Sequence, residues 1–146
     1  MKPLVSVLMP VYNSEKYLVE ALDSLTGQDY ENLEIIILDD GSNDSSFSII
    51  TRYKERDGRI IVERRENRGI GSGRNRLLSL ASGDFVFFFD SDDILLSKSF
   101  ISTLVSDSEK YSAEVVSAIT VPFRKKAKRT KDKGVRVYSG KEFSSL

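Results

Sequence analysis

Phe85-Val86-Phe87-Phe88-Phe89-Asp90-Ser91-Asp92-Asp93 is the stretch that decides how this chain is expected to fold. Its first five residues are apolar, and a short apolar run that follows Gly83-Asp84 is typical of a strand buried on both faces. Three carboxylates then fall within four positions, where they repel one another and are costly to desolvate. A divalent cation relieves both problems. Alternatively, the aspartates cap the next segment and face water.

The composition limits the kind of site that the chain can build. With no Cys and no His among 146 residues, disulfides and thiolate sites are excluded, and so are histidine ligands. A metal site made from the remaining oxygen ligands suits Mg²⁺ or Mn²⁺. The size fits one domain, and no apolar run approaches the roughly 20 residues of a membrane-spanning helix. The first apolar run is also too short for a signal peptide.

The net charge of zero hides an uneven distribution. Residues 1–123 contain 13 Lys and Arg and 20 Asp and Glu, whereas residues 124–146 contain 9 and 2. The basic residues concentrate in 124–133, which is either a solvated loop or a segment that contacts anionic lipid head groups at a membrane surface. Nucleic acid is not an expected partner, because no aromatic residues interleave with the basic ones. Together with the missing export signal, this predicts a cytoplasmic protein at the inner face of the cell membrane.

Strand and helix patterns alternate along the chain. This alternation predicts an α/β fold with a mostly parallel sheet between helices. The expected strands cover residues 4–10, 33–38, 59–63, 85–89, 114–121 and 135–138. Residues 139–142 form a capping box, which marks the start of another helix, so we expect the chain to be part of a longer protein.

Polar clusters directly follow three of the expected strands, at residues 10–13, 39–42 and 90–93. Ligands of parallel sheets bind beyond the carboxyl ends of the strands, where these clusters would meet. Two Asp-rich clusters at one edge need a positive counterpart, which a metal with phosphate supplies. Residues 39–42 alone are also an ordinary turn-and-cap sequence. Tyr12 either packs on a base or packs within its loop.

Individual residues in these clusters suit separate roles. Asp92 and Asp93 are the candidate metal ligands, with phosphate oxygens completing the coordination. The carboxylate of Asp39 or Asp40 can accept a hydrogen bond from a base N–H or a ribose hydroxyl. Arg74 can hold a phosphate through two parallel hydrogen bonds, or it can simply pair with an acid.

Glycines at positions 69, 71 and 73 are expected in a loop that leads into a helix. Their spacing differs from the G-x-G-x-x-G fingerprint of dinucleotide-binding domains, and they do not follow the first strand. The chain also lacks the G-x-x-x-x-G-K-[ST] pattern. Dinucleotide and P-loop sites are therefore not predicted.

Taken together, the motifs resemble family 2 glycosyltransferases of the GT-A fold, over about residues 3–122. They keep the family's order at residues 10–13, 17–18, 24–25, 28–30, 32–44, 67–69, 74–75 and 90–93. The resemblance implies the three-layer αβα, Rossmann-like fold of nucleotide-diphospho-sugar transferases. It also implies transfer of a sugar from a nucleotide-diphosphate sugar to an acceptor, with inversion. Gly73 departs from the family, which usually has Ala there.

The resemblance also implies site residues and partners. The nucleotide-binding residues would be Pro10, Tyr12, Asn13, Asp39, Asp40, Arg74, Ser91 and Asp92. The ligands of Mg²⁺ or Mn²⁺ would be Asp92 and Asp93, with Asp90 opening the Asp-x-Asp motif. The expected donor is a UDP-sugar rather than a GDP- or dTDP-sugar, and the expected acceptor is a cell-surface glycan or a lipid-linked molecule.

The same resemblance predicts the domain organisation. Residues 1–123 would form the nucleotide-sugar-binding core, residues 124–134 a basic loop, and residues 135–146 the start of an acceptor-side region. The family's catalytic base is an acidic residue in the acceptor-binding half, so we expect it beyond residue 146. We therefore expect this chain to bind the donor but to transfer little or no sugar.

Two other classes remain open on the sequence. A nucleotidyltransferase shares the sheet architecture but would carry a Gly-rich, basic loop after the first strand, where residues 10–13 stand instead. A non-catalytic nucleotide-binding or interaction module would use the Asp cluster structurally. A phospho-acceptor domain would carry Lys at the end of the fifth strand, where Val121-Pro122 stand.

Overall fold

The structure is a computed structural model that describes residues 2–117 and 136–138. It divides into two compact units, Met1–Lys98 and Ser99–Leu146, and each unit is described by itself. The first unit contains all three polar clusters.

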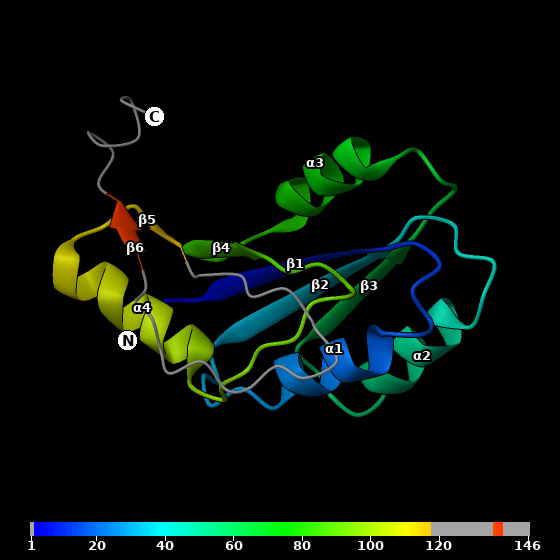
Figure 1. The fold of residues 1–146 in the computed structure, drawn as a ribbon. Coiled ribbons are helices and arrows are strands. Elements are labelled where there is room, and N and C mark those ends of the chain that lie inside the picture. Colours follow the sequence, from blue (N-terminus) through cyan, green and yellow to red (C-terminus); the bar gives the residue numbers. More distant parts are fainter. Residues whose placement is uncertain (1, 118–135, 139–146) are drawn as a thin grey trace. The chain divides into compact units, whose positions relative to one another are not determined.

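The first unit is a parallel sheet with helices on both faces (Figure 1). Its strands are β1 (Val5–Val11), β2 (Leu33–Asp39), β3 (Ile60–Arg64) and β4 (Phe85–Phe88), in the order β3-β2-β1-β4. Helices α1 (Leu18–Thr26) and α2 (Ser46–Lys54) cover one face, and α3 (Ile70–Leu80) covers the other. The predicted αβα architecture with a mostly parallel sheet is confirmed.

Strand alternation divides the core between the two faces of the sheet. Leu8 of β1 and Ile36 and Leu38 of β2 form one buried cluster with Leu77 of α3. Because successive side chains of a strand point to opposite faces, the odd-numbered residues of β2 face α1 and α2 instead. The same alternation continues past the end of β2, so the side chains of Asp39 and Asp40 lie on opposite faces of the sheet.

Strand β4 differs from its prediction as a strand buried on both faces. Val86 is 43% exposed and Phe88 is 41% exposed, whereas Phe89, just beyond the strand, is 2% exposed. In the described sheet β4 lies at an edge and pairs with β1 alone, so alternate side chains face outward. The prediction of full burial was therefore wrong for β4, because Val86 and Phe88 are exposed and Phe85 and Phe87 are only partly buried.

The glycine-rich segment is also more regular than its sequence predicts. Helix α3 begins at Ile70, so Gly71 and Gly73 lie inside the helix rather than in a loop. Gly69 precedes the helix with a φ of 82°, a conformation that glycine adopts at no steric cost. The expected loop is therefore confined to the residues before the helix.

The second unit contains α4 (Phe100–Tyr111) and an antiparallel pair formed by β5 (Val115–Ser117) and β6 (Arg136–Tyr138). The predicted strand at 114–121 was expected in the parallel sheet. Its described part, β5, pairs instead with β6 in a separate sheet, which bears out a short strand near 135–138. The basic segment 124–133 and the capping box at 139–142 lie outside the described residues. Among the described helices, none has the length and apolar character needed to cross a membrane.

Glu34 joins three segments at the edge of the sheet opposite the polar clusters. Its carboxylate accepts hydrogen bonds from the Ser6 hydroxyl and from Ser82, whose backbone N–H and hydroxyl lie 2.6 Å and 2.8 Å away. Partial burial alone would raise the pKa of Glu34, but these hydrogen bonds outweigh it and lower the pKa below its ordinary value of 4.5. The Ser6 hydroxyl also accepts a hydrogen bond from the Gly83 N–H at 2.8 Å, so the turn before β4 is fastened to β1.

Two glycines should respond oppositely to substitution by alanine. A Cβ at Gly83 would lie 2.6 Å from the Ser6 Oγ and 2.8 Å from the Leu4 carbonyl oxygen, so Gly83→Ala should cost about 2–3 kcal/mol of unfolding free energy. A Cβ at Gly71 would meet no atom within 4 Å, so Gly71→Ala should stabilise the helix by about 0.5–1 kcal/mol. Urea denaturation measures both changes. A Gly83→Ala variant as stable as the original chain would contradict the close approach described for this turn.

Replacing Glu34 should change how stability depends on pH. Its lowered pKa contributes stability that is present above about pH 4.5 and is lost as the pH falls through the lower folded-state value. Glu34→Gln should therefore lose about 1–2 kcal/mol at pH 7, and the difference should shrink as the pH falls below 4.5. Glu31→Gln, at an exposed glutamate on the preceding loop, serves as the control. A difference that does not change with pH would show that the charge of Glu34 is not involved.

Candidate functional site

Hydrogen bonds join the three polar clusters that follow β1, β2 and β4. These strands are adjacent and parallel, so their carboxyl ends lie at one edge of the sheet. The Ser14 and Ser91 hydroxyls lie 2.7 Å apart, the Asn13 N–H donates to the Ser42 hydroxyl at 3.0 Å, and the Asp40 N–H donates to the Val11 carbonyl at 2.8 Å. The structure therefore brings together the segments that the sequence places at the ends of separate strands.

Asn13 shapes the first of these loops. It has a φ of 49°, which asparagine tolerates better than most residues, and its Oδ1 accepts the Asn43 N–H at 2.8 Å. The backbone N–H and the side-chain Oδ1 of Asn13 thus both connect the loop after β1 to the loop after β2. The two other predicted site residues of this segment differ in exposure: Tyr12 is 49% exposed, and Pro10, within β1, is half-buried. Tyr12 therefore presents its ring to solvent beside the strand ends.

Asp39 lies on the α2 side of the sheet and is fully buried. Its Oδ2 lies 3.0 Å from the Arg64 Nε, and its Oδ1 accepts the Ser42 N–H at 3.3 Å. The Arg64 guanidinium in turn lies 4.3 Å from the centre of the Phe47 ring of α2. Asp39 orders the turn after β2 and has no exposed surface with which to contact a nucleotide directly.

Asp40 faces the opposite side, toward α3. Its Oδ1 lies 2.6 Å from the Arg65 Nε, and both of its carboxylate oxygens lie 3.3 Å from the Arg68 N–H. Gly41, with a φ of 81°, allows this arrangement, because a Cβ there would lie 2.9 Å from the Asn67 backbone nitrogen. Asp40 is thus held against the segment that connects β3 to α3.

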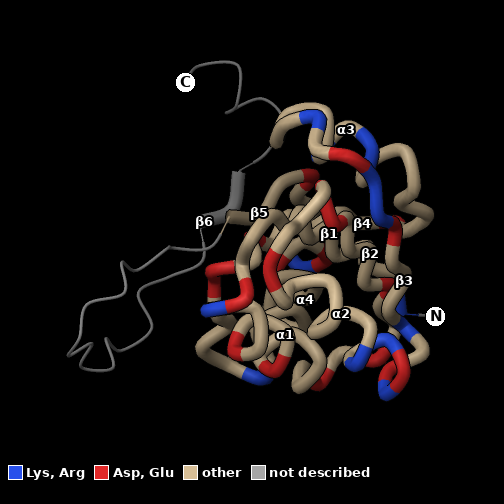
Figure 2. The backbone as a smooth tube through the Cα atoms, turned by 90° about the vertical axis from the view of Figure 1, so that its right-hand side faces the viewer, with Lys and Arg blue, Asp and Glu red and all other residues tan. Residues whose placement is uncertain are grey.

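Among the described residues, the positive charges that face Asp39 and Asp40 come from two arginines of the chain itself. Arg64 and Arg65 pair with Asp39 and Asp40, and the segment from the end of β3 toward α3 carries both acidic and basic residues (Figure 2). Sequence reasoning missed both arginines. Asp39 and Arg64 occupy the same register position of neighbouring strands, so two consecutive arginines at the end of the third strand were the available signal.

Arg74 pairs with an acid, which was the simpler of its two predicted roles. Its Nη2 lies 3.0 Å from the Asp90 Oδ1, and its guanidinium lies 5.8 Å from the centre of the Phe88 ring. Both side chains of the pair are more than 40% exposed, so the ion pair contributes little to stability. The Arg74 Nε is buried and has no hydrogen-bond acceptor among the described residues, which leaves this side chain with unused donor capacity.

The acidic cluster after β4 turns sharply, and the Asp93 N–H donates to the Asp90 carbonyl at 3.0 Å. Burial, and then the charges of Asp90 and Asp92, raise the pKa of Asp93 above its ordinary value. Ser91 is nearly buried beside Ser14. Within the part of the chain that the structure describes, no three acidic side chains converge as a metal cage. The cluster instead fits an ion that takes one or two carboxylates and fills its other positions with water and phosphate, as Mg²⁺ does.

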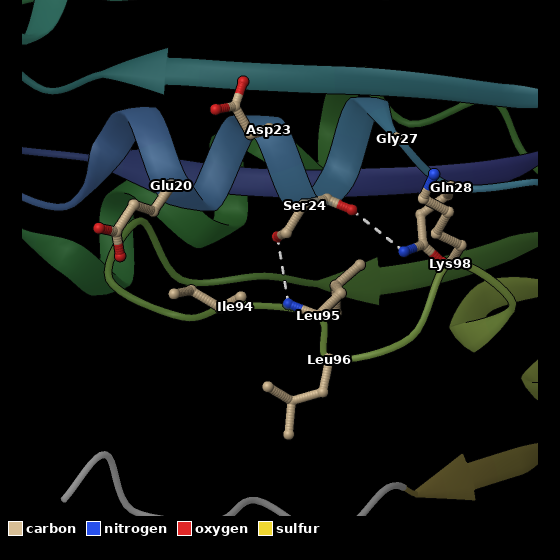
Figure 3. A pocket seen from close by; sticks show the side chains of 9 residues that line it. All are labelled: Glu20, Asp23, Ser24, Gly27, Gln28, Ile94, Leu95, Leu96 and Lys98. Carbon is tan, nitrogen blue, oxygen red and sulfur yellow. Dashed lines mark hydrogen bonds between the residues drawn. The ribbon is translucent and has the colours of Figure 1, made fainter. Parts of the chain in front are cut away.

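A pocket of about 460 Å³ lies between α1 with the two residues after it and residues 94–98 (Figure 3). Two hydrogen bonds connect its two walls: the Ser24 hydroxyl accepts the Leu95 N–H at 3.1 Å, and the Gln28 side chain donates to the Ser97 carbonyl at 2.8 Å. None of the predicted site residues lines this pocket. The candidate site therefore rests on the strand ends and their hydrogen bonds.

Comparison with known proteins identifies the family. The model of glycosyl transferase family 2 matches residues 6–143. Glycosyltransferase GlyA of Streptococcus pneumoniae serotype 4 is 40% identical over 111 residues, which cover 76% of this chain and 16% of GlyA.

Solved structures agree with the fold. Mannosyltransferase PcManGT from Pyrobaculum calidifontis, in complex with GDP-Man and Mn²⁺, is 25% identical with a TM-score of 0.75, and the match covers 83% of this chain and 36% of that one. S. aureus TarS 1-349, in complex with UDP-GlcNAc, is 31% identical with a TM-score of 0.75, and the match covers 88% and 37%. This chain thus spans well under half the length of these proteins. Because the family model matches most of its length, the chain belongs to glycosyl transferase family 2.

Proposed function

We propose that this chain is the donor-binding part of an inverting glycosyltransferase. It would bind a nucleotide-diphosphate sugar, with UDP preferred over GDP or dTDP, and the sugar would pass to a cell-surface glycan or lipid-linked acceptor. Such a protein would act in the synthesis of cell-envelope polysaccharide. The family supports glycosyl transfer in general, and the solved relatives named above bind a UDP-sugar and a GDP-sugar.

The observation that carries the proposal is the joining of three strand ends into one polar edge. The Ser14–Ser91 and Asn13–Ser42 hydrogen bonds bring the loop of Tyr12 next to the Asp-rich segments. This edge offers an exposed aromatic ring for a base, a carboxylate at Asp40 for its N–H groups, and acidic groups for a metal. A nucleotide diphosphate with a divalent cation has all three complementary features.

Asp92 and Asp93 are the residues that would hold Mg²⁺ or Mn²⁺ in this proposal. Burial and the neighbouring charges already disfavour the ionised form of Asp93, and a cation relieves that repulsion. The metal would supply positive charge to the departing diphosphate. Arg74 would add to this charge by engaging a phosphate oxygen, since its guanidinium has a buried donor without an acceptor in the described residues.

Calorimetric titration tests nucleotide binding directly. With Mn²⁺ present we expect the chain to bind UDP more tightly than GDP. Binding should weaken at least about tenfold in EDTA or in Asp92→Asn, because the diphosphate charge is then uncompensated. The control is Asp29→Asn, at an exposed aspartate between α1 and β2 and therefore at the opposite edge of the sheet. A chain that binds neither nucleotide in the presence of Mn²⁺ would overturn the proposed function.

Contact with a membrane through residues 124–133 is the second part of the proposal and places the protein at the cytoplasmic face of the cell membrane. Its support is the sequence alone, because these residues lie outside the described part of the chain. Replacing Lys125, Lys126, Lys128 and Arg129 by alanine should strongly reduce sedimentation with anionic phosphatidylserine vesicles at low salt, since each basic residue near such a surface contributes about 1 kcal/mol. Neutral phosphatidylcholine vesicles serve as the control. Equal sedimentation of the original chain with both kinds of vesicle would remove the membrane role and leave nucleotide binding untouched.

A further inference from the structure

Arg65 lies closer to the candidate site than its sequence position suggests. Its side chain is 16% exposed, and its Nε contacts the Asp40 Oδ1 at 2.6 Å. Its Nη1 lies 3.5 Å from the Ser72 carbonyl oxygen at the start of α3. Its Nη2 is buried and contacts no acceptor among the described residues. A guanidinium held in this way restricts the orientation of the carboxylate that it contacts, which here is Asp40.

The two oxygens of Asp40 are used unequally. Oδ1 accepts the short bond from Arg65, whereas Oδ2 accepts only a share of the Arg68 N–H at 3.3 Å. A carboxylate oxygen has two lone pairs, so Oδ2 keeps the capacity to accept another hydrogen bond. Asp40 itself is 6% exposed, so its orientation decides whether that capacity reaches a ligand.

Building on the proposed function, we propose that Arg65 is a positioning residue that aims the Oδ2 of Asp40 at the Watson–Crick edge of the donor's base. The site would thereby select bases that carry a hydrogen on the ring nitrogen of that edge. Uracil N3 and guanine N1 carry such a hydrogen, whereas cytosine N3 and adenine N1 are acceptors. A carboxylate accepts hydrogen bonds and does not donate them, so a fixed Asp40 favours the first pair of bases and repels the second.

The surroundings explain why Arg65, and not Arg64, has this role. Strand alternation directs Arg64 to the buried Asp39 on the α2 side, where it also contacts Phe47. Arg65 lies on the α3 side, where the backbone of Gly73 leaves space beside it. A Cβ at Gly73 would lie 3.7 Å from the Arg65 Nη2. The two arginines thus serve opposite faces of the sheet, and only Arg65 serves the side of Asp40.

The test measures selectivity between bases as well as affinity. UDP and CDP are titrated into the original chain, Arg65→Met, Arg65→Lys and Asp40→Asn, with Mn²⁺ present. Arg65→Met should weaken UDP binding about tenfold and reduce the ratio of UDP affinity to CDP affinity. Arg65→Lys keeps the charge, so it should lose less UDP affinity and less of this selectivity than Arg65→Met. Asp40→Asn should also narrow the ratio, because an amide can either donate or accept. If the chain prefers GDP, the matched pair is GDP and ADP.

Two controls separate positioning from folding. Arg76→Met removes an arginine of the nearby helix α3 whose Nη2 pairs with Glu63 at 2.7 Å on the surface, and it should leave nucleotide binding unchanged. Arg65→Met alone leaves the Asp40 carboxylate without its arginine and could unfold the chain for that reason. The double variant Arg65→Met/Asp40→Asn removes both charges, so it keeps the test possible in that case. In the Asp40→Asn background, Arg65→Met should change UDP affinity less than about twofold, because its effect acts through Asp40.

Three results would count against the inference. An Arg65→Met variant with unchanged affinity and an unchanged UDP-to-CDP ratio would overturn it. An equal loss for both nucleotides that persists in the Asp40→Asn background would show that Arg65 contacts the ligand or supports the fold independently of Asp40, and would also overturn it. If the original chain binds no nucleotide at all, the proposed function fails, and this inference falls with it.

Discussion

Neutralisation of two consecutive aspartates by two consecutive arginines is the constraint on which the site depends. Asp39 ends β2, whose residues are almost all buried, and Asp40 follows directly. A carboxylate buried there without a partner would cost several kcal/mol. Because the side chains of both segments alternate, Arg64 reaches Asp39 on one face and Arg65 reaches Asp40 on the other. The Asp39–Arg64 pair orders the turn after β2, whereas the Asp40–Arg65 pair leaves the Asp40 Oδ2 able to accept another hydrogen bond.

The loops then follow from these fixed ends. Gly41 permits the chain after β2 to touch the segment after β3, and Ser42 accepts a hydrogen bond from the loop after β1. Ser14 of that loop meets Ser91 of the segment after β4. Short polar side chains and the close approach at Gly41 thus connect four chain segments, which suits an edge that must remain accessible to a polar ligand. Rigid strands beneath them supply the support that such loops need.

The sequence predicted most of the architecture because its signals were local. Apolar runs marked β1 and β2, and the alternation of strand and helix patterns indicated the parallel sheet between helices. The prediction failed where the decisive fact was spatial. The phenylalanines of β4 read as fully buried because periodicity cannot show that a strand lies at an edge, and Gly71 and Gly73 read as a loop because packing against the sheet can override a weak helix propensity. The acidic clusters follow strand ends as predicted, yet the arginine partners of Asp39 and Asp40 come from the end of a neighbouring strand and require knowledge of register.

The Arg74–Asp90 pair affects how anions and cations bind at this edge of the sheet. The two half-exposed groups neutralise each other across 3.0 Å, so together they attract neither anions nor cations strongly. An anion that draws Arg74 away would leave the Asp90 carboxylate uncompensated beside Asp92 and Asp93, and a cation arriving there would free Arg74 in the same way. Each ion would then strengthen the binding of the other by the same factor, a mutual dependence that is required by thermodynamic linkage.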